Sequence, residues 1–146
     1  MRWLFAHPLP IDHAKVVEAI ARAERNTSGE IRVLVARHRT ADAVAAARRH
    51  FDRLGMARTR SRNAVLIFLA PRSRSFAVIG DRGVHEKCGD AFWSELASAM
   101  AAHFKRGKFT EGLEHGVERA GALLAEHFPP EPGARGEPPT DVKEVD

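Results

Sequence analysis

Side chains that carry oxygen ligands stand at the ends of three predicted strands, where they could bind a hard cation. Glu30 begins the first strand, Asn63 precedes the second and Asp81 follows the third. Calcium takes about six to eight oxygen ligands, including carboxylates, amides and backbone carbonyls. These residues are therefore our candidate ligands for Ca²⁺ or another divalent cation. The alternative is that Asp81 is only a turn former and Glu30 an exposed strand end. The spacing of an EF-hand is absent.

Arginines cluster next to these positions. The run Arg58-Thr59-Arg60-Ser61-Arg62 ends just before the second strand, and Arg82 follows the third. Guanidinium groups bind phosphate through paired N–H donors, and a basic run can also hold a nucleic-acid backbone. Arg60, Arg62 and Arg82 are therefore candidate ligands for phosphate or another anion. No recognition helix or aromatic platform accompanies them, so we expect no specific nucleic-acid binding. The alternative is a solvated basic loop.

The segment after the third strand adds His85, Glu86 and Cys88. A thiol at a helix N-terminus has a lowered pKa, so Cys88 beside His85 could be a reactive thiolate. Cys88 also begins the apolar stripe of the next predicted helix, which would make it an inert buried thiol. No serine stands in the strained, glycine-flanked turn that a nucleophile needs. We therefore assign no catalytic residue. Histidines further along lack metal-ligand spacing: His103, His115 and His127.

Alternating helix and strand patterns must position these residues. Asp12 is expected to cap a helix over residues 12–25, and the β-branched stretch 30–36 is the first strand. Thr40 is expected to cap a second helix that ends before Gly55. The remaining elements are an apolar strand at 64–70, a four-residue turn, a returning strand at 75–80, a helix from Cys88 to Phe104, and a last helix after Gly107.

The connections between the strands predict one shared edge. If the first two strands are parallel through a right-handed crossover, both begin at the same edge of the sheet. The third strand returns antiparallel, so its end arrives there too. We therefore expect Glu30, Asn63 and Asp81 to meet at this edge. His85, Glu86 and the arginine loop should lie beside them.

Length and composition indicate one globular domain. The chain has 146 residues, of which 44% are hydrophobic and 29% charged, with a formal net charge of +4. The lone Cys88 excludes an internal disulfide and a multi-cysteine metal site. The opening segment lacks the apolar run and cleavage site of a signal peptide, and no stretch is long enough to span a bilayer. We therefore expect a cytoplasmic location.

Three segments are predicted: an N-terminal arm at 1–11, an α/β domain at 12–128 and a flexible proline-rich tail at 129–146. The tail holds five of the eight prolines after Phe128 together with scattered charges. Such a composition buries too little apolar surface to offset the entropy lost on ordering. We expect it to stay outside the core.

Three stretches carry a resemblance to the TPM domain family: 62–67, 78–84 and 104–113, supported by Ser28-Gly29-Glu30-Ile31. Their order and spacing, over about 12–128, resemble the family's central strand, glycine-containing turn and linked helix pair. The resemblance implies a three-layer αβα Rossmann-like sandwich with a small mixed sheet, made of a parallel crossover and an antiparallel hairpin. It also implies calcium binding, acid phosphatase activity or membrane-complex maintenance as family roles.

Two functions of different class follow. The first is a binding or assembly module for a protein partner, holding a divalent cation at the edge of Glu30, Asn63 and Asp81. The second is a metal-assisted phosphatase in which Asp81 holds the cation and Arg60 or Arg62 clamps the phosphate oxygens. Non-specific nucleic-acid binding through the arginine loop ranks third.

Overall fold

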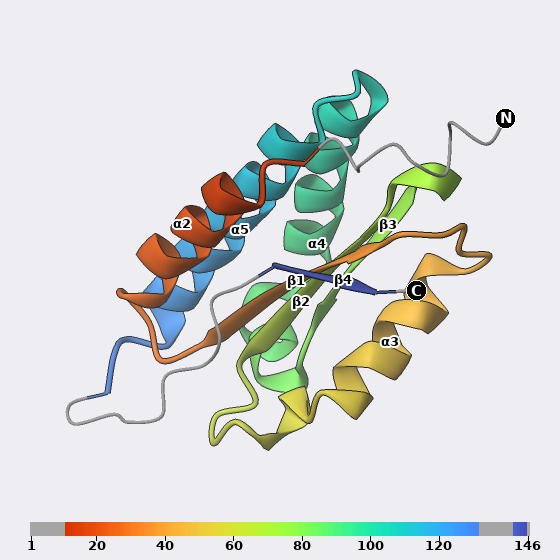
Figure 1. The fold of residues 1–146 in the computed structure, drawn as a ribbon. Coiled ribbons are helices and arrows are strands. Elements are labelled where there is room, and N and C mark those ends of the chain that lie inside the picture. Colours follow the sequence, from red (N-terminus) through yellow and green to blue (C-terminus); the bar gives the residue numbers. More distant parts are fainter. Residues whose placement is uncertain (1–10, 132–141, 146) are drawn as a thin grey trace, which may run out of the picture.

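The computed structural model describes residues 11–131 and 142–145. Within these ranges the fold is a mixed sheet between two helical layers (Figure 1). The predicted αβα sandwich is thereby confirmed. The elements in chain order are α2 (His13–Glu24), β1 (Glu30–Ala36), α3 (Ala43–Arg53), η1 (Met56–Arg58), β2 (Ala64–Ala70), η2 (Pro71–Ser73), β3 (Ser75–Gly80), α4 (Arg82–Lys105), α5 (Phe109–His127) and β4 (Val142–Val145).

The sheet has the strand order β3-β2-β1-β4. β1 runs parallel to both β2 and β4, whereas β2 and β3 form the predicted antiparallel hairpin. In the register Glu30 lies opposite Ala64, and Val65 lies opposite Gly80. The amino ends of β1 and β2 and the carboxyl end of β3 therefore share one edge, as expected.

The central strand β2 is buried along its whole length because helices cover both faces of the sheet. On one face Val65 and Ile67 pack in the core that α2, α4 and α5 enclose. On the other face Leu66 and Phe68 pack against α3 through Phe51. This double burial explains the continuous apolar sequence of the strand.

Two helix starts differ from the prediction. α3 is capped by Asp42, whose carboxylate accepts from the Ala45 N–H at 3.1 Å, and not by Thr40. The Thr40 N–H instead donates to Ser73 Oγ in the hairpin turn. α4 begins at Arg82, well before the predicted start at Cys88, and is interrupted by Gly89 with φ of 73°.

The end of the chain corrects the prediction of a flexible tail. Residues 142–145 form β4, which adds to the free edge of β1. The Arg37 N–H donates to the Val145 carbonyl at 2.7 Å, and His13 Nε2 lies 3.2 Å from Glu144 Oε2. Val142 is buried in the main core. The composition signal failed because a short strand needs only one or two apolar residues when a partner strand is already in place. The predicted flexible stretch at 132–141 and the arm at 1–10 lie outside the described residues.

Removal of every residue after Pro130 should therefore lower the melting temperature by about 5 to 10 °C. The truncation exposes the edge of β1 and loses the burial of one valine and several main-chain hydrogen bonds. Thermal unfolding followed by circular dichroism measures the effect. As a control, Lys143→Ala alters an exposed side chain of the same strand and should leave the melting temperature unchanged. An unchanged melting temperature in the truncated protein would show that β4 adds nothing to stability.

Candidate functional site

The candidate site is the polar edge where β1 and β2 begin and β3 ends; we call it the polar rim. Asp81 N donates to the Ala64 carbonyl at 2.9 Å, and Glu30 N donates to the Asn63 carbonyl at 3.4 Å. These bonds extend the sheet register by one residue and hold the three strand ends side by side. The polar rim consists of Glu30, Arg60, Arg62, Asn63, Asp81, Arg82, His85 and Glu86.

Asp81 forms the main ion pair of the polar rim. Its side chain is 5% exposed and accepts from Arg62 twice, with Nε to Oδ2 at 2.6 Å and Nη2 to Oδ1 at 2.8 Å. The hydrogen bonds to this carboxylate raise the pKa of the Arg62 guanidinium. Asp81 also caps α4, because Oδ1 accepts from the Arg82 N–H at 2.8 Å. The same carboxylate of Asp81 thus caps the helix and pairs with Arg62.

Two glycines allow this arrangement. Gly83 N donates to the Arg62 carbonyl at 3.0 Å, and a Cβ at Gly83 would overlap the carbonyl oxygen of Ser61. Only glycine lets the first turn of α4 lie so close to the loop before β2. Arg62 itself has φ of 51°, a left-handed conformation that is uncommon outside glycine. The Gly80 position leaves room for the ring of Trp93.

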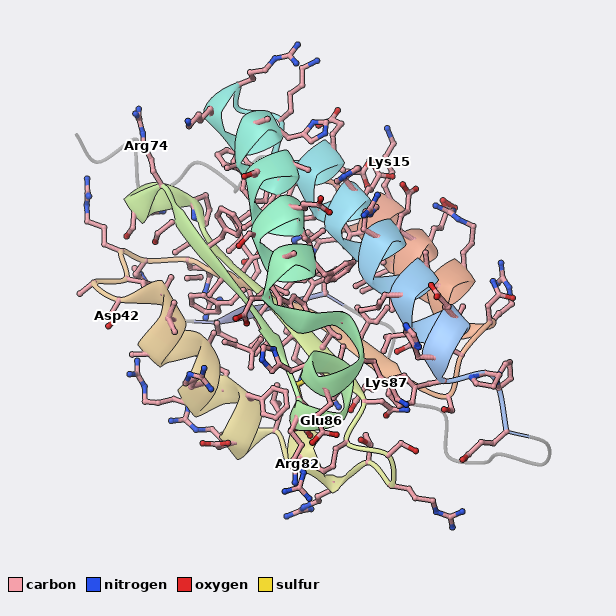
Figure 2. All side chains as sticks on the ribbon, turned by 180° about the vertical axis from the view of Figure 1, so that it is seen from behind. Lys15, Asp42, Arg74, Arg82, Glu86 and Lys87 are labelled. Carbon is pink, nitrogen blue, oxygen red and sulfur yellow. The ribbon has the colours of Figure 1, made fainter. Side chains whose placement is uncertain are left out.

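His85 binds Trp93 and Asp90. Its Nδ1 accepts from the indole Nε1 at 3.1 Å, and its Nε2 lies 3.5 Å from Asp90 Oδ1. The indole bond keeps the proton of the neutral ring on Nε2. Both interactions of His85 run to residues of its own helix beyond Gly89, so His85 links the two parts of α4 that Gly89 separates. Figure 2 shows Arg82 and Glu86 at the beginning of this helix, both of them exposed.

Glu30 lies on the α3 face of the sheet. Its Oε2 accepts from Arg32 Nε at 2.9 Å, and the side chains of the two residues are only 12% and 17% exposed. By strand alternation, Glu30, Ala64 and Asp81 point to the same face as Leu66 and the α3 core. Two carboxylates that are each neutralised by an arginine thus flank the small Ala64.

Asn63 points to the opposite face. It is 2% exposed, and its Nδ2 donates to Ser28 Oγ at 3.2 Å, in the turn before β1. Its backbone N–H donates to Thr59 Oγ1 at 3.0 Å. The Oδ1 atom is buried and has no hydrogen-bond partner among the described residues. The structure therefore brings Glu30 and Asp81 to one face of the polar rim and the amide of Asn63 to the other.

The remaining predicted residues form fewer contacts with other side chains. Arg60 and Arg82 are exposed, and of the three predicted anion ligands Arg62 alone pairs with a carboxylate among the described residues. Across residues 11–131 and 142–145, no three His, Cys, Asp or Glu side chains converge as a metal site would require. Any cation at the polar rim would thus need amide, carbonyl or water oxygens as well.

Cys88 lies in the second turn of α4 and not at its N-terminus. It is half-buried against the main core, and burial raises the pKa of its thiol. The protonated thiol is therefore favoured at neutral pH, which supports the reading of an inert buried thiol.

The prediction from the sequence differs from the structure at the polar rim in two respects. It treated Arg62 and Asp81 as ligands for different ions, although they bind each other. It also started α4 too late, although Val84 and Cys88 follow the spacing of a helix. Gly80 and Gly83 were the reason, because glycines at these positions indicated a turn.

These features define an open mixed αβα sandwich with a charged rim at the amino ends of its parallel strands. The chain belongs to the TPM domain family, whose model matches residues 9–123. Among the described residues no helix is both long and apolar enough to cross a membrane.

Two solved structures are similar to this chain. The BA42 protein from the psychrophilic bacterium Bizionia argentinensis, solved by NMR, is 36% identical with a TM-score of 0.82, over 91% of this chain and 92% of that one. The N-terminal domain of the cg2496 protein from Corynebacterium glutamicum is 13% identical with a TM-score of 0.58, over 88% of this chain and 85% of that one. The second likeness concerns the fold alone. No curated protein matches this chain.

The contact between Gly83 and the loop before β2 leads to a prediction. Gly83→Ala should lower the free energy of unfolding by about 1 to 3 kcal/mol, because the new methyl group displaces the backbone of Ser61 and Arg62. An exposed helical glycine would give the opposite sign, since alanine favours the helix. Urea unfolding measures the change. The control Lys87→Ala, on the exposed surface of the same helix, should stay within about 0.5 kcal/mol of the parent. A stabilised Gly83→Ala protein would contradict the tight contact.

Proposed function

We propose that this TPM domain is a binding or assembly module whose polar rim holds a divalent cation such as Ca²⁺, with Asp81 as the main ligand. The observation that carries the proposal is the buried carboxylate of Asp81, whose charge is balanced by an arginine that is itself 35% exposed. A buried carboxylate needs a positive partner. Arg62 can move into solvent and leave its place to a cation.

The hydrogen bonds of Asp81 leave room for such an exchange. Among the described residues, Oδ1 accepts from Arg62 and from the Arg82 N–H, whereas Oδ2 accepts from Arg62 alone. A carboxylate offers about four lone-pair positions, so Oδ2 keeps one position open even with Arg62 bound. Hard cations take several oxygen ligands at once, and Glu30 adds a second carboxylate on the same face.

Asn63 has a positioning role in this proposal. Its amide is turned to the other face of the sheet, where it ties the start of β2 to Ser28. Its carbonyl accepts the Glu30 N–H, so it fixes the spacing between β1 and β2 at the polar rim. Arg82 follows Asp81 in the chain, and Arg60 lies two residues before Arg62. Both are exposed and would contact the protein partner that the module binds.

Calcium should raise the melting temperature of the parent protein through Asp81. A cation that binds only the folded state stabilises it by about 2.7 kcal/mol at a hundredfold excess over its dissociation constant. Asp81→Asn should abolish the gain, because the amide keeps the shape and the cap but lacks the charge. Asp90→Asn is the control, since it removes an exposed carboxylate of the same helix and should keep the gain. Calorimetric titration gives the dissociation constants.

The variant Arg62→Gln shows whether Arg62 competes with the cation for Asp81 or helps to bind the cation. If Arg62 holds the place of the cation, its removal should lower stability without calcium and strengthen calcium binding several-fold. Equal calcium effects on the parent and on Asp81→Asn, or no effect on either, would refute the cation site.

A metal-assisted phosphatase is the second candidate, favoured by the exposed Arg82, which follows Asp81 in the chain, and by the exposed Arg60 in the loop that ends at Arg62. Such an enzyme needs the cation to polarise the phosphoryl group and free guanidiniums to hold its oxygens. Hydrolysis of p-nitrophenyl phosphate should then depend on added cation and fall at least tenfold in Asp81→Asn, with Asp90→Asn unaffected. Calcium binding without any cation-dependent hydrolysis would leave the binding module as the function of the polar rim.

A further inference from the structure

A second candidate site lies at the other end of the sheet, where β2 ends and β3 begins. A cavity of about 480 Å³ opens there between the hairpin turn, the end of α4 and the start of α5; we call it the hairpin pocket. Its volume falls within the range of about 300 to 1,000 Å³ that is typical of small-molecule sites. The polar rim contributes no residue to it. Its lining includes Arg74, Phe76, Ala101, Phe104, Lys105 and Phe109.

Three phenyl rings form the apolar wall of the hairpin pocket. Phe76 and Phe104 meet edge to face with centroids 5.0 Å apart, and the centroids of Phe104 and Phe109 are 5.9 Å apart. All three rings are only partly buried against the main core. Gly112 allows this packing, because a Cβ there would overlap the ring of Phe104. Partly exposed rings beside a cavity offer a surface for an apolar ligand body.

Two cations stand at the mouth of the hairpin pocket. Arg74 and Lys105 are exposed, and neither forms an ion pair with any described residue. Among the described residues that line the cavity there is no carboxylate. Figure 2 shows Arg74 at the tip of the hairpin, extending outward near the end of α4. Arg106 and Lys108 add positive charge on the adjoining turn.

The hairpin pocket has a fixed position between the carboxyl end of β2 and the start of β3. Arg72 Nε donates to the Arg37 carbonyl at 2.7 Å, which ties the hairpin turn to the loop after β1. In open α/β sheets, ligands bind in the crevice outside the carboxyl ends of the strands. The hairpin pocket adjoins the carboxyl end of β2, whose Leu69 lines it.

We propose that the hairpin pocket binds a small organic anion. The apolar body, an aromatic ring or a short chain, packs on Phe76, Phe104 and Phe109. The carboxylate or phosphate head pairs with Arg74 and Lys105, which have no anionic partner of their own among the described residues. Charge-assisted hydrogen bonds at the mouth and apolar contact inside then select for a ligand that has both parts. This site is independent of the cation proposed for the polar rim.

The fluorescent probe 1-anilinonaphthalene-8-sulfonate, an aromatic ring system with one anionic group, tests the proposal on the full chain. We expect saturable binding to the folded protein and amide shift changes confined to the hairpin, the end of α4 and the start of α5. Phenyl phosphate should displace the probe, and phenol and inorganic phosphate at equal concentration should displace it much less. Equal displacement by phenol would show that the cations play no part and would refute the proposal.

Variants test whether the probe binds in the hairpin pocket. Arg74→Gln combined with Lys105→Gln should weaken probe binding at least tenfold, and Ala101→Phe should abolish it by filling the cavity. The control Arg48→Gln combined with Arg49→Gln removes two exposed cations from α3 and should bind the probe as the parent does. If Ala101→Phe unfolds, the shift map of the parent decides alone. Shift changes elsewhere, or equal loss in the α3 control, would overturn the site.

Discussion

The carboxylate of Asp81 joins three parts of the chain that meet only in the folded state. It follows β3, caps α4 and accepts both hydrogen bonds of Arg62 from the loop before β2. A carboxylate that is 5% exposed would be costly to bury without these donors. The close approach of Gly83 to the same loop is therefore as necessary as the ion pair, because it brings the guanidinium within reach.

Asp81 therefore both stabilises the fold and serves as the proposed cation ligand. The ion pair of Arg62 with Asp81 holds the start of β2 to the start of α4, and it stabilises the fold when no other cation binds Asp81. A divalent cation at Asp81 would release Arg62, whose left-handed backbone and exposed side chain make the loop the part of the polar rim most able to rearrange. The cation and Arg62 would then compete for the carboxylate of Asp81. Cation binding would therefore shift the conformation of the loop that carries Arg62.

The sequence predicted β1, β2 and β3 at their observed bounds. Burial on both faces leaves an unbroken apolar pattern in β2, whereas β1 was recognised by its β-branched residues and β3 by the hairpin turn before it. The sequence also predicted which strand ends meet. It could not predict that Asp81 binds Arg62, since that contact depends on the approach of backbones 19 residues apart. Nor could it predict β4, because the pattern of Val142–Val145 becomes a strand only beside the finished edge of β1. The side to which Asn63 points was equally hidden, because one residue of register reverses it.

The two ends of the sheet differ in how their charges are balanced, and this difference follows from the chain path. At the amino ends of β1 and β2, carboxylates and arginines neutralise each other, within β1 as Glu30 with Arg32, and between the end of β3 and the loop before β2 as Asp81 with Arg62. At the carboxyl end of β2 the tight hairpin and the turn between α4 and α5 bring cations to phenyl rings, and no described residue adds a carboxylate to this lining. A cation that binds at the polar rim competes with an arginine for its carboxylate, whereas the hairpin pocket, which has no carboxylate among its described lining residues, can accept an anion directly. The same parallel crossover thus leaves one surface suited to a competing cation and another suited to an organic anion.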